Sequence, residues 1–279
     1  MAVTIIAECG SNHCGSLELA LLHIDEAFHC GANWVKFQLF RANTLDSREE
    51  KRARLSRYEL PLTWLPVLRD RAHQYGLQFG VSVFAPDLVP LLHGVVDFVK
   101  VAAYDLCYED LVTAVARLDV PIVLSTAMAT WDEIHRALGW IKSMDAASSP
   151  PITLLHGVAQ YPATLEDQNL LAIDTLLFNL SDSVGLSDHT LGYEAAVIAV
   201  ARGASMIEKH FVLDPVVYSL VRNSPDFPHS AGPTAFAEMV RAVRRAEGAL
   251  GDGRKDGPLP CEMALYNTAR RSNNKPLRG

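Results

Sequence analysis

The sequence predicts a (β/α)8 TIM barrel. Short apolar or β-branched runs alternate with longer amphipathic runs along the chain, and this alternation predicts parallel strands joined by helices. The alternation occurs eight times, and the predicted strands are apolar throughout, as expected where both faces of a sheet are buried. The chain has 279 residues, close to the roughly 250 of a typical barrel of this kind. We therefore expect a single barrel domain over residues 1–279.

Each predicted strand is followed by a predicted helix. The strands are expected at residues 3–7, 33–38, 77–81, 96–102, 121–124, 152–156, 183–186 and 205–208. The helices are expected at residues 17–30, 63–75, 87–93, 109–118, 131–143, 167–178, 193–202 and 233–250. Ser16 is expected to be the N-cap of the first helix. A doubly wound sheet would alternate in the same way, but the glycines after the first strand lack the spacing of a nucleotide-binding loop, so the barrel is favoured.

The composition excludes several classes of function. The formal net charge is −7, which does not predict a basic surface for nucleic acid. The sequence contains no run of eighteen apolar residues, so it predicts no membrane-spanning helix. The N-terminus lacks the features of a signal peptide. The five cysteines do not have the spacing of a disulfide framework or a zinc site. We expect a cytoplasmic protein with reduced thiols that binds neither nucleic acid nor a membrane.

Polar or ionisable side chains stand at the end of nearly every predicted strand. Active sites of such barrels lie at the carboxyl ends of the strands, so these side chains are expected to meet in one mouth. Burying so many polar groups without partners would be costly, and they must therefore bind one another or a ligand. They include Glu8, Asn12, His13, Lys36, Gln38, Ser82, Lys100, Asp105, Ser125, His156, Tyr161, Ser187, Asp188, His189, Lys209 and His210.

Two lysines, Lys36 and Lys100, predict a site for a phosphate or for a phosphate together with a carboxylate. Lysines act as point charges toward such anions, and the nearby serine hydroxyls can donate hydrogen bonds. The alternative is that each inward lysine forms an ion pair with a neighbouring carboxylate, for which Glu208 or Asp188 is available.

Two histidines, His189 and His210, are the candidate metal ligands. Neutral imidazole suits ions such as Mn, Fe and Zn, and two histidines leave positions open for water and substrate. A single strand histidine is more often a core residue, and we interpret His156 in that way. The histidines of the predicted helices are expected at the surface; these are His23, His29, His73, His93 and His135.

Two long connections follow the second and the eighth predicted strands. The first, residues 41–62, carries the charge run at residues 48–52, which predicts a solvated helix more than a lid. The second, residues 212–232, is interpreted as a lid over the site, because long loops after the strands of a barrel often cover the active site.

At these residues the sequence resembles the sialic acid synthases, the family of N-acetylneuraminate synthase and its relatives. The matching phrases run in order along the chain: IIAECGSNHCGSLELA, GANWVKFQLF, VDFVKVAAYDL, PIVLSTAMATWDEI, LLHGVAQYPATLEDQNL, VGLSDHTLGYEAAVIAVARGAS and MIEKHFVLD. The resemblance implies an enzyme that condenses phosphoenolpyruvate with a sugar aldehyde on a (β/α)8 barrel. It also implies a divalent metal, Mn²⁺ in most members, with Mg²⁺ or Co²⁺ as substitutes.

The resemblance also assigns roles to residues. It implies that His189 and His210 bind the metal and that Glu8 is the catalytic carboxylate. The residues that would hold phosphoenolpyruvate are Lys36, Ser82, Lys100, Ser125 and Ser187. Asp105 would face the aldehyde and take part in catalysis, and Tyr161 and Asp226 would also face the aldehyde.

The sequence departs from the family pattern in three places. Ala103 lacks a hydroxyl that the family usually has and Tyr104 adds bulk, while Ala159 replaces an asparagine or serine. The family members continue into a small antifreeze-like domain, which lends an arginine to the partner subunit and implies a homodimer. Residues 1–279 are expected to lack that domain.

We therefore expect one of two ways of completing the sugar site. Either the loops close it, with Arg52, Arg222 and Asp226 as the available polar groups and an aldehyde other than N-acetylmannosamine as the preferred one, or a separate small protein supplies the domain. Two other functions stay open. One is a metal-dependent pyruvate aldolase or lyase on the same barrel, and the other is a non-catalytic phosphosugar-binding protein.

Overall fold

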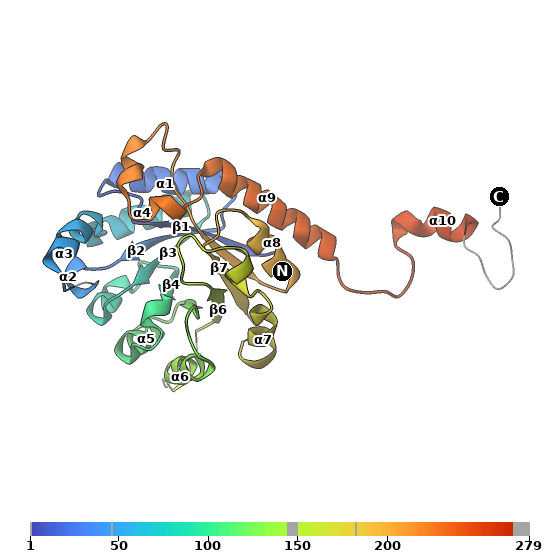
Figure 1. Cartoon of the computed structure of the whole chain (residues 1–279), viewed down its shortest axis with the longest axis horizontal. Helices are drawn as coiled ribbons and strands as arrows, with labels where there is room; N and C mark the ends of the chain where they lie inside the picture. Colours follow the sequence, from blue (N-terminus) through green and yellow to red (C-terminus); the bar gives the residue numbers. More distant parts are fainter. Residues whose placement is uncertain (1, 46, 144–149, 182, 270–279) are drawn as a thin grey trace. The chain divides into compact units, whose positions relative to one another are not determined.

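The computed structural model describes residues 2–45, 47–143, 150–181 and 183–269 and contains a closed barrel of eight parallel strands (Figure 1). The chain divides into two compact units, Met1–Glu247 and Gly248–Gly279. The first unit holds the barrel. The second contains the 3-10 helix η8 (Pro260–Glu262) and the helix α10 (Met263–Thr268). None of the helices in the described residues combines the length and the hydropathy that crossing a bilayer requires.

The eight strands pair in chain order, and β1 closes the barrel by pairing with β8. Their bounds are β1 (Thr4–Gly10), β2 (Trp34–Leu39), β3 (Gln78–Val83), β4 (Phe98–Val101), β5 (Ile122–Ser125), β6 (Ile152–Gly157), β7 (Val184–Asp188) and β8 (Met206–His210). The predicted (β/α)8 barrel is therefore confirmed. Strands β1, β7 and β8 run two or more residues past their predicted ends, so that Glu8, Asp188 and His210 lie within strands.

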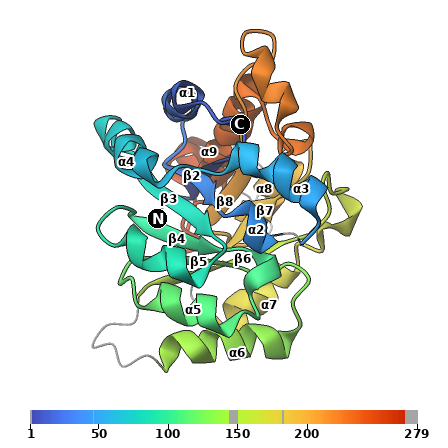
Figure 2. The ribbon, with the colours of Figure 1, turned by 90° about the vertical axis from the view of Figure 1, so that its left-hand side faces the viewer.

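The helices lie outside the ring of strands (Figure 2). They are α1 (Leu17–His29), α4 (Leu65–Gln74), α5 (Glu109–Ala116), α6 (Trp131–Lys142), α7 (Ala172–Asn179), α8 (Glu194–Ala201) and α9 (Pro233–Leu250). Ser16 is the N-cap of α1, as predicted, because its hydroxyl accepts a hydrogen bond from the Leu19 amide at 3.2 Å. Thr130 and Glu133 form a capping box that fixes the start of α6.

Two predicted helices differ from the structure. The one expected at 87–93 is the 3-10 helix η3 (Pro86–Leu92), since Pro90 removes a backbone donor from its interior. The one expected at 167–178 begins only at Ala172. It is preceded by the 3-10 helix η5 (Glu166–Gln168) and by Asn169, whose left-handed backbone (φ 43°) interrupts a helix.

The two long connections contain short helical segments. The first forms α2 (Ala42–Leu45), α3 (Glu49–Leu55) and the 3-10 helix η1 (Ser56–Tyr58). Helix α3 contains most of the charge run and buries none of its side chains, which confirms the predicted solvated helix. The second connection contains the 3-10 helices η6 (Ser219–Asn223) and η7 (Phe227–His229).

Successive residues of each strand point alternately into the barrel and toward the helices. The residues that point outward join the helices in one large core, which includes Ile5, Val35, Phe79, Val99 and Leu186. A separate cluster fills the amino-terminal half of the barrel interior; its members are Ile6, Phe98, Val123, Leu155 and Met206, with Trp34 packed against them. Two residues further along, the inward positions of β1, β2, β4, β5 and β8 become polar, while that of β6 is Gly157.

Phe98 is the largest side chain of this interior cluster that is fully buried, and its ring lies 4.4 Å from that of Trp34. It fills the space beside Gly80, where an added Cβ would meet the ring of Phe98 at 2.5 Å. Glycine on β3 therefore allows an aromatic ring to close the floor beneath the polar residues.

Phe98→Ala should lower the free energy of unfolding by about 3–5 kcal/mol, because it removes a buried ring from an interior that cannot collapse into the space. Urea denaturation followed by circular dichroism measures this change. The control is Phe178→Ala, whose side chain is 90% exposed and which should change stability by no more than about 0.5 kcal/mol. Equal stabilities of the two variants would contradict the role given to Phe98.

Candidate active site

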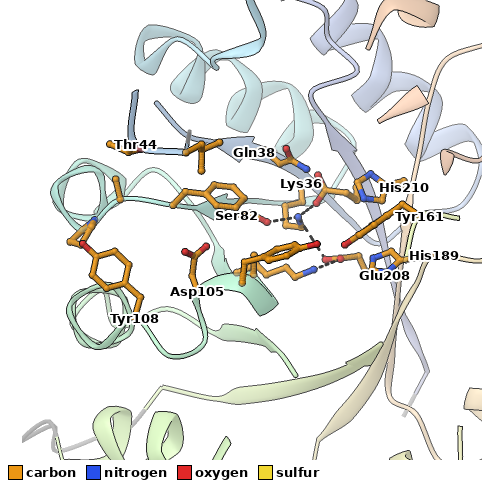
Figure 3. A pocket seen from close by; sticks show the side chains of 18 of the residues that line it. Lys36, Gln38, Thr44, Ser82, Asp105, Tyr108, Tyr161, His189, Glu208 and His210 are labelled. Carbon is orange, nitrogen blue, oxygen red and sulfur yellow. Dashed lines mark hydrogen bonds and ion pairs between the residues drawn. The ribbon is translucent and has the colours of Figure 1, made fainter. Parts of the chain in front are cut away.

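A cavity of about 680 Å³ opens where the carboxyl ends of the strands meet (Figure 3). Most of the predicted site residues line it, namely Glu8, Lys36, Ser82, Lys100, Asp105, Tyr161, His189 and His210. Three others do not: Ser125 and Ser187 are buried, and Asp226 has a carboxylate oxygen within 4.8 Å of a ring nitrogen of His210. The lining also includes residues that were not predicted as part of the site, among them Thr44, Phe84 and Tyr108.

Lys36 lies at the centre of a buried network of charges. It forms an ion pair with Glu8 from the neighbouring strand, and its Nζ is 3.8 Å from Glu208 Oε2. It also donates a hydrogen bond to Ser82 Oγ at 2.6 Å. Glu8 has no neighbouring lysine in the sequence, and its cation comes from the adjacent strand because Glu8 and Lys36 are register partners.

Glu208 joins the second lysine to this network. Its Oε1 accepts hydrogen bonds from Lys100 Nζ and, at 3.0 Å, from Ser187 Oγ. Both lysines are thus paired with carboxylates, which was the alternative open from the sequence. Asp188 does not pair with Lys36 or Lys100, because its side chain points outward. Its Oδ2 lies 2.7 Å from Lys209 Nζ.

Burial and charge shift the pKa values of the network in opposite directions. Burial lowers the pKa of Lys36 to about 7, although Glu208 acts to raise it. For Glu208, burial alone would raise the pKa, but the two lysines outweigh it and hold the pKa below its ordinary value. The four groups are two lysines and two carboxylates, so their formal charges cancel.

His189 and His210 present imidazoles suited to metal binding. Burial lowers the pKa of His189 to about 4 and that of His210 well below its ordinary value, so both rings are neutral at pH 7. His189 Nδ1 donates to the Val158 carbonyl at 2.6 Å, which leaves the lone pair on Nε2. His210 Nδ1 is buried and has no hydrogen-bond partner among the described residues. The two ring centroids are 6.1 Å apart.

A third histidine, His229, lies beside His210 and was missed in the sequence. Ligand atoms of His210, Asp226 and His229 lie within 4.8 Å of one another, whereas His189 is not in this group. Asp226 is held in place by Ser11, whose amide and hydroxyl donate to its Oδ2 at 2.8 and 2.6 Å. Imidazole nitrogens with a carboxylate form a donor set that fits Mn²⁺ and similar divalent ions. The only signal for His229 in the sequence is its spacing of three residues from Asp226.

Asp105 and Tyr161 lie at different positions along the cavity. Burial raises the pKa of Asp105 to about 6, and its Oδ2 has no hydrogen-bond partner in the described part of the chain. The Tyr161 ring packs 4.2 Å from the His189 ring, and burial raises the pKa of its hydroxyl. Asp105 is thus free to bind a ligand hydroxyl, while Tyr161 covers the two imidazoles.

Some polar residues serve the fold. His23 was expected at the surface, and this prediction is wrong: it is fully buried on the apolar face of α1, where its Nδ1 donates to the Leu19 carbonyl at 2.7 Å. His156, interpreted as a core residue, is half-buried and bonded to the Gln168 carbonyl at 2.7 Å. Asn12 is likewise turned away from the cavity and donates to the Phe211 carbonyl at 2.8 Å.

The two long connections lie beside this cavity. The first contributes Thr44 and Leu45 from α2 to the lining. Of the described residues in 212–232 none lines the cavity, but the His229 ring lies 4.7 Å from that of His210. The second connection therefore supports the imidazole side of the site, and its predicted role as a lid stays a prediction.

The sequence matches the model of the NeuB family over residues 23–255. It is 37% identical over 270 residues to an uncharacterized protein of Methanocaldococcus jannaschii, covering 96% of this chain and 77% of that protein. It is 34% identical over 270 residues to the pseudaminic acid synthase of Campylobacter jejuni, covering 91% and 76% of the two chains.

The structure is similar to the crystal structure of N-acetylneuraminic acid (sialic acid) synthetase from Leptospira borgpetersenii. The TM-score is 0.87 at 32% identity, and the alignment covers 96% of this chain and 91% of that one. The resemblance to sialic acid synthases stated from the sequence motifs is therefore confirmed, and with it a synthase-type enzyme at the level of the family.

Glu208→Gln should lower the free energy of unfolding by about 3–5 kcal/mol, because it leaves two buried lysines with one carboxylate between them. Chemical denaturation at pH 7 measures this loss. Glu238→Gln is the matched control, since Glu238 lies on an exposed face of α9 and should have little effect. A Glu208→Gln variant as stable as the control would show that the charge network does not depend on this carboxylate.

Proposed function

The chain belongs to the NeuB family, and we propose that it condenses phosphoenolpyruvate with a sugar-type aldehyde, giving a 2-keto-3-deoxy sugar acid and inorganic phosphate. The observation that carries the proposal is the pair of buried lysines, Lys36 and Lys100, beside two neutral imidazoles in a single cavity. The lysines suit the phosphate and carboxylate of an enol phosphate, and the imidazoles suit a divalent ion.

Lys36, Lys100 and Ser82 would bind phosphoenolpyruvate. The lysines are held in place by Glu8 and Glu208, so their ammonium groups are oriented before a ligand arrives. Ser125 and Ser187, buried beside the cavity, would complete the anion site. Charge-assisted hydrogen bonds of this type contribute roughly 1.5–3 kcal/mol each, enough to hold a dianion in place.

His189 and His210 would hold the divalent metal, Mn²⁺ or another ion such as Mg²⁺ or Co²⁺, with Asp226 and His229 close to His210. The unpartnered Nδ1 of His210 and the Nε2 of His189, which lies 3.3 Å from the Ser187 hydroxyl, fit such a group. When bound, the ion supplies Lewis-acid polarisation of the aldehyde carbonyl.

The residues of the chain would then act in sequence. C3 of the enol phosphate attacks the aldehyde carbon, and the aldehyde oxygen takes up a proton. Water adds at C2, with Glu8 accepting its proton, and the resulting tetrahedral intermediate expels phosphate by cleavage of the C–O bond. Lys36 and Lys100 stabilise the phosphate charge throughout, and Tyr161, Asp105 and Asp226 orient the aldehyde.

The test is release of inorganic phosphate from phosphoenolpyruvate in the presence of Mn²⁺ and an aldehyde. Phosphate release should require the aldehyde, stop in excess EDTA and return when Mn²⁺ is restored. Glu8→Gln should lower kcat by two or more decades, a typical size for general acid–base catalysis, and by far more than it weakens phosphoenolpyruvate binding through the loss of the Lys36 ion pair. A pyruvate aldolase would form product without releasing phosphate, and a non-catalytic binding protein would show neither reaction.

The affinity for phosphoenolpyruvate should fall as the pH rises above 7. The pKa of Lys36 is lowered to about 7 by burial, so the free protein loses this charge above pH 7 and must take up a proton when the anion binds. The expected loss approaches tenfold per pH unit. Calorimetry between pH 7 and 9, in two buffers with different ionisation enthalpies, measures both the affinity and the proton uptake.

Lys36→Met is the matched variant for that experiment. It keeps the bulk of the side chain and removes the charge, so it should weaken binding at pH 7 by a decade or more and abolish the proton uptake. If the wild-type chain binds phosphoenolpyruvate equally well at pH 7 and pH 9, Lys36 does not titrate in this way.

A further inference from the structure

We infer that the outer end of the cavity, formed by Thr44, Leu45, Asp105 and Tyr108, selects an uncharged aldehyde and discriminates against one with a terminal phosphate. The inference rests on the proposed function and specifies the substrate of the same site. It follows from where the cations, carboxylates and rings of this cavity lie.

The direction of the aldehyde follows from the position of the lysines. Its carbonyl carbon must meet the enol phosphate near Lys36 and Lys100, so the other end of its carbon chain extends away from them. Figure 3 shows Thr44, Asp105 and Tyr108 on the side of the cavity opposite to His189, His210 and Glu208. The distal end of the substrate therefore lies at the outer end.

No cation lies at the outer end among the described lining residues. The two cations of the lining are Lys36 and Lys100, and both are at the inner end. Asp87, which also lines the cavity, forms an ion pair with Arg41 just before α2. The remaining charged group is Asp105, half-buried with an unpartnered oxygen. A phosphate dianion would meet a carboxylate here, whereas phosphate sites require cations or converging backbone amides.

The other outer-end groups suit a neutral sugar. Leu45 and the ring of Tyr108 are 41% and 42% exposed, so they offer apolar surface that a ligand can cover. Tyr104, 67% exposed, adds a second ring to the lining. Sugar C–H faces pack on such rings, while Asp105 and Thr44 can hydrogen-bond to hydroxyls. The outer end therefore matches an uncharged aldehyde with apolar substituents.

The experiment compares three matched pairs of aldehydes: N-acetylmannosamine, arabinose and erythrose, each with and without a phosphate on its terminal carbon. Phosphate release from phosphoenolpyruvate gives kcat/KM for each, after correction for any phosphate that the aldehyde itself loses. The uncharged member should exceed its phosphorylated partner at least tenfold in every pair that turns over. A phosphorylated member that is equal or faster would overturn the inference and leave the proposed function intact.

Absence of phosphate release with all six aldehydes would instead overturn the proposed function.

Two variants test the residues of the outer end. Leu45→Arg places a cation at the outer end and should raise the ratio of kcat/KM for the phosphorylated to the uncharged member at least tenfold, without changing phosphoenolpyruvate affinity in calorimetry. Tyr108→Ala should lower kcat/KM for the uncharged aldehyde several-fold. Tyr193→Ala, at an exposed tyrosine outside the cavity, is its control. An unchanged ratio in Leu45→Arg would contradict the charge argument.

Discussion

The buried network of Glu8, Lys36, Glu208 and Lys100 is the constraint on which the rest of the site depends. Each of these groups is at most 7% exposed, and removing any one charge leaves an opposite charge uncompensated in a medium of low polarity. Apolar residues of similar size would often be as stabilising or more so. The network places two oriented lysine side chains at the bottom of an open cavity, which supports the proposed role in binding a charged ligand.

The closed parallel barrel makes this network possible through its register. Glu8 is opposite Lys36 on one side and opposite His210 on the other, and Ser82 is opposite Lys100. A shift of one residue in the register of β8 would turn Lys209 inward and Glu208 outward. A third cation would then take the place of the carboxylate that pairs with Lys36 and Lys100. Lys209 in the correct register is buried on the other face with Asp188 and the Thr190 carbonyl. The outer ion pair thus disfavours the wrong register.

The sequence was sufficient for the eight strands and for most of the polar residues at the inner end of the cavity, because apolar runs end in polar residues at the same edge of the barrel. It could not reveal which groups pair, because Glu8 and Lys36 meet only through strand register. His229 was missed because it comes from a 3-10 segment with no periodic pattern. His23 was misplaced because a histidine satisfied by the Leu19 carbonyl four residues earlier can lie on the apolar face of a helix. The start of α7 was predicted too early, because the left-handed backbone of Asn169 interrupts the helix and hydrophobic periodicity does not reveal such a residue.

The same network would allow the proposed phosphoenolpyruvate site to bind its anion without a large rearrangement. Because Glu8 and Glu208 already orient the ammonium groups, the lysines need not be reoriented when the ligand binds, and such preorganisation is the main electrostatic advantage of a folded site. Because burial lowers the pKa of Lys36 to about 7, this group can take up a proton as an anion binds. The apolar floor formed by Phe98 and its neighbours closes the site from below, which strengthens these interactions by lowering the local polarity.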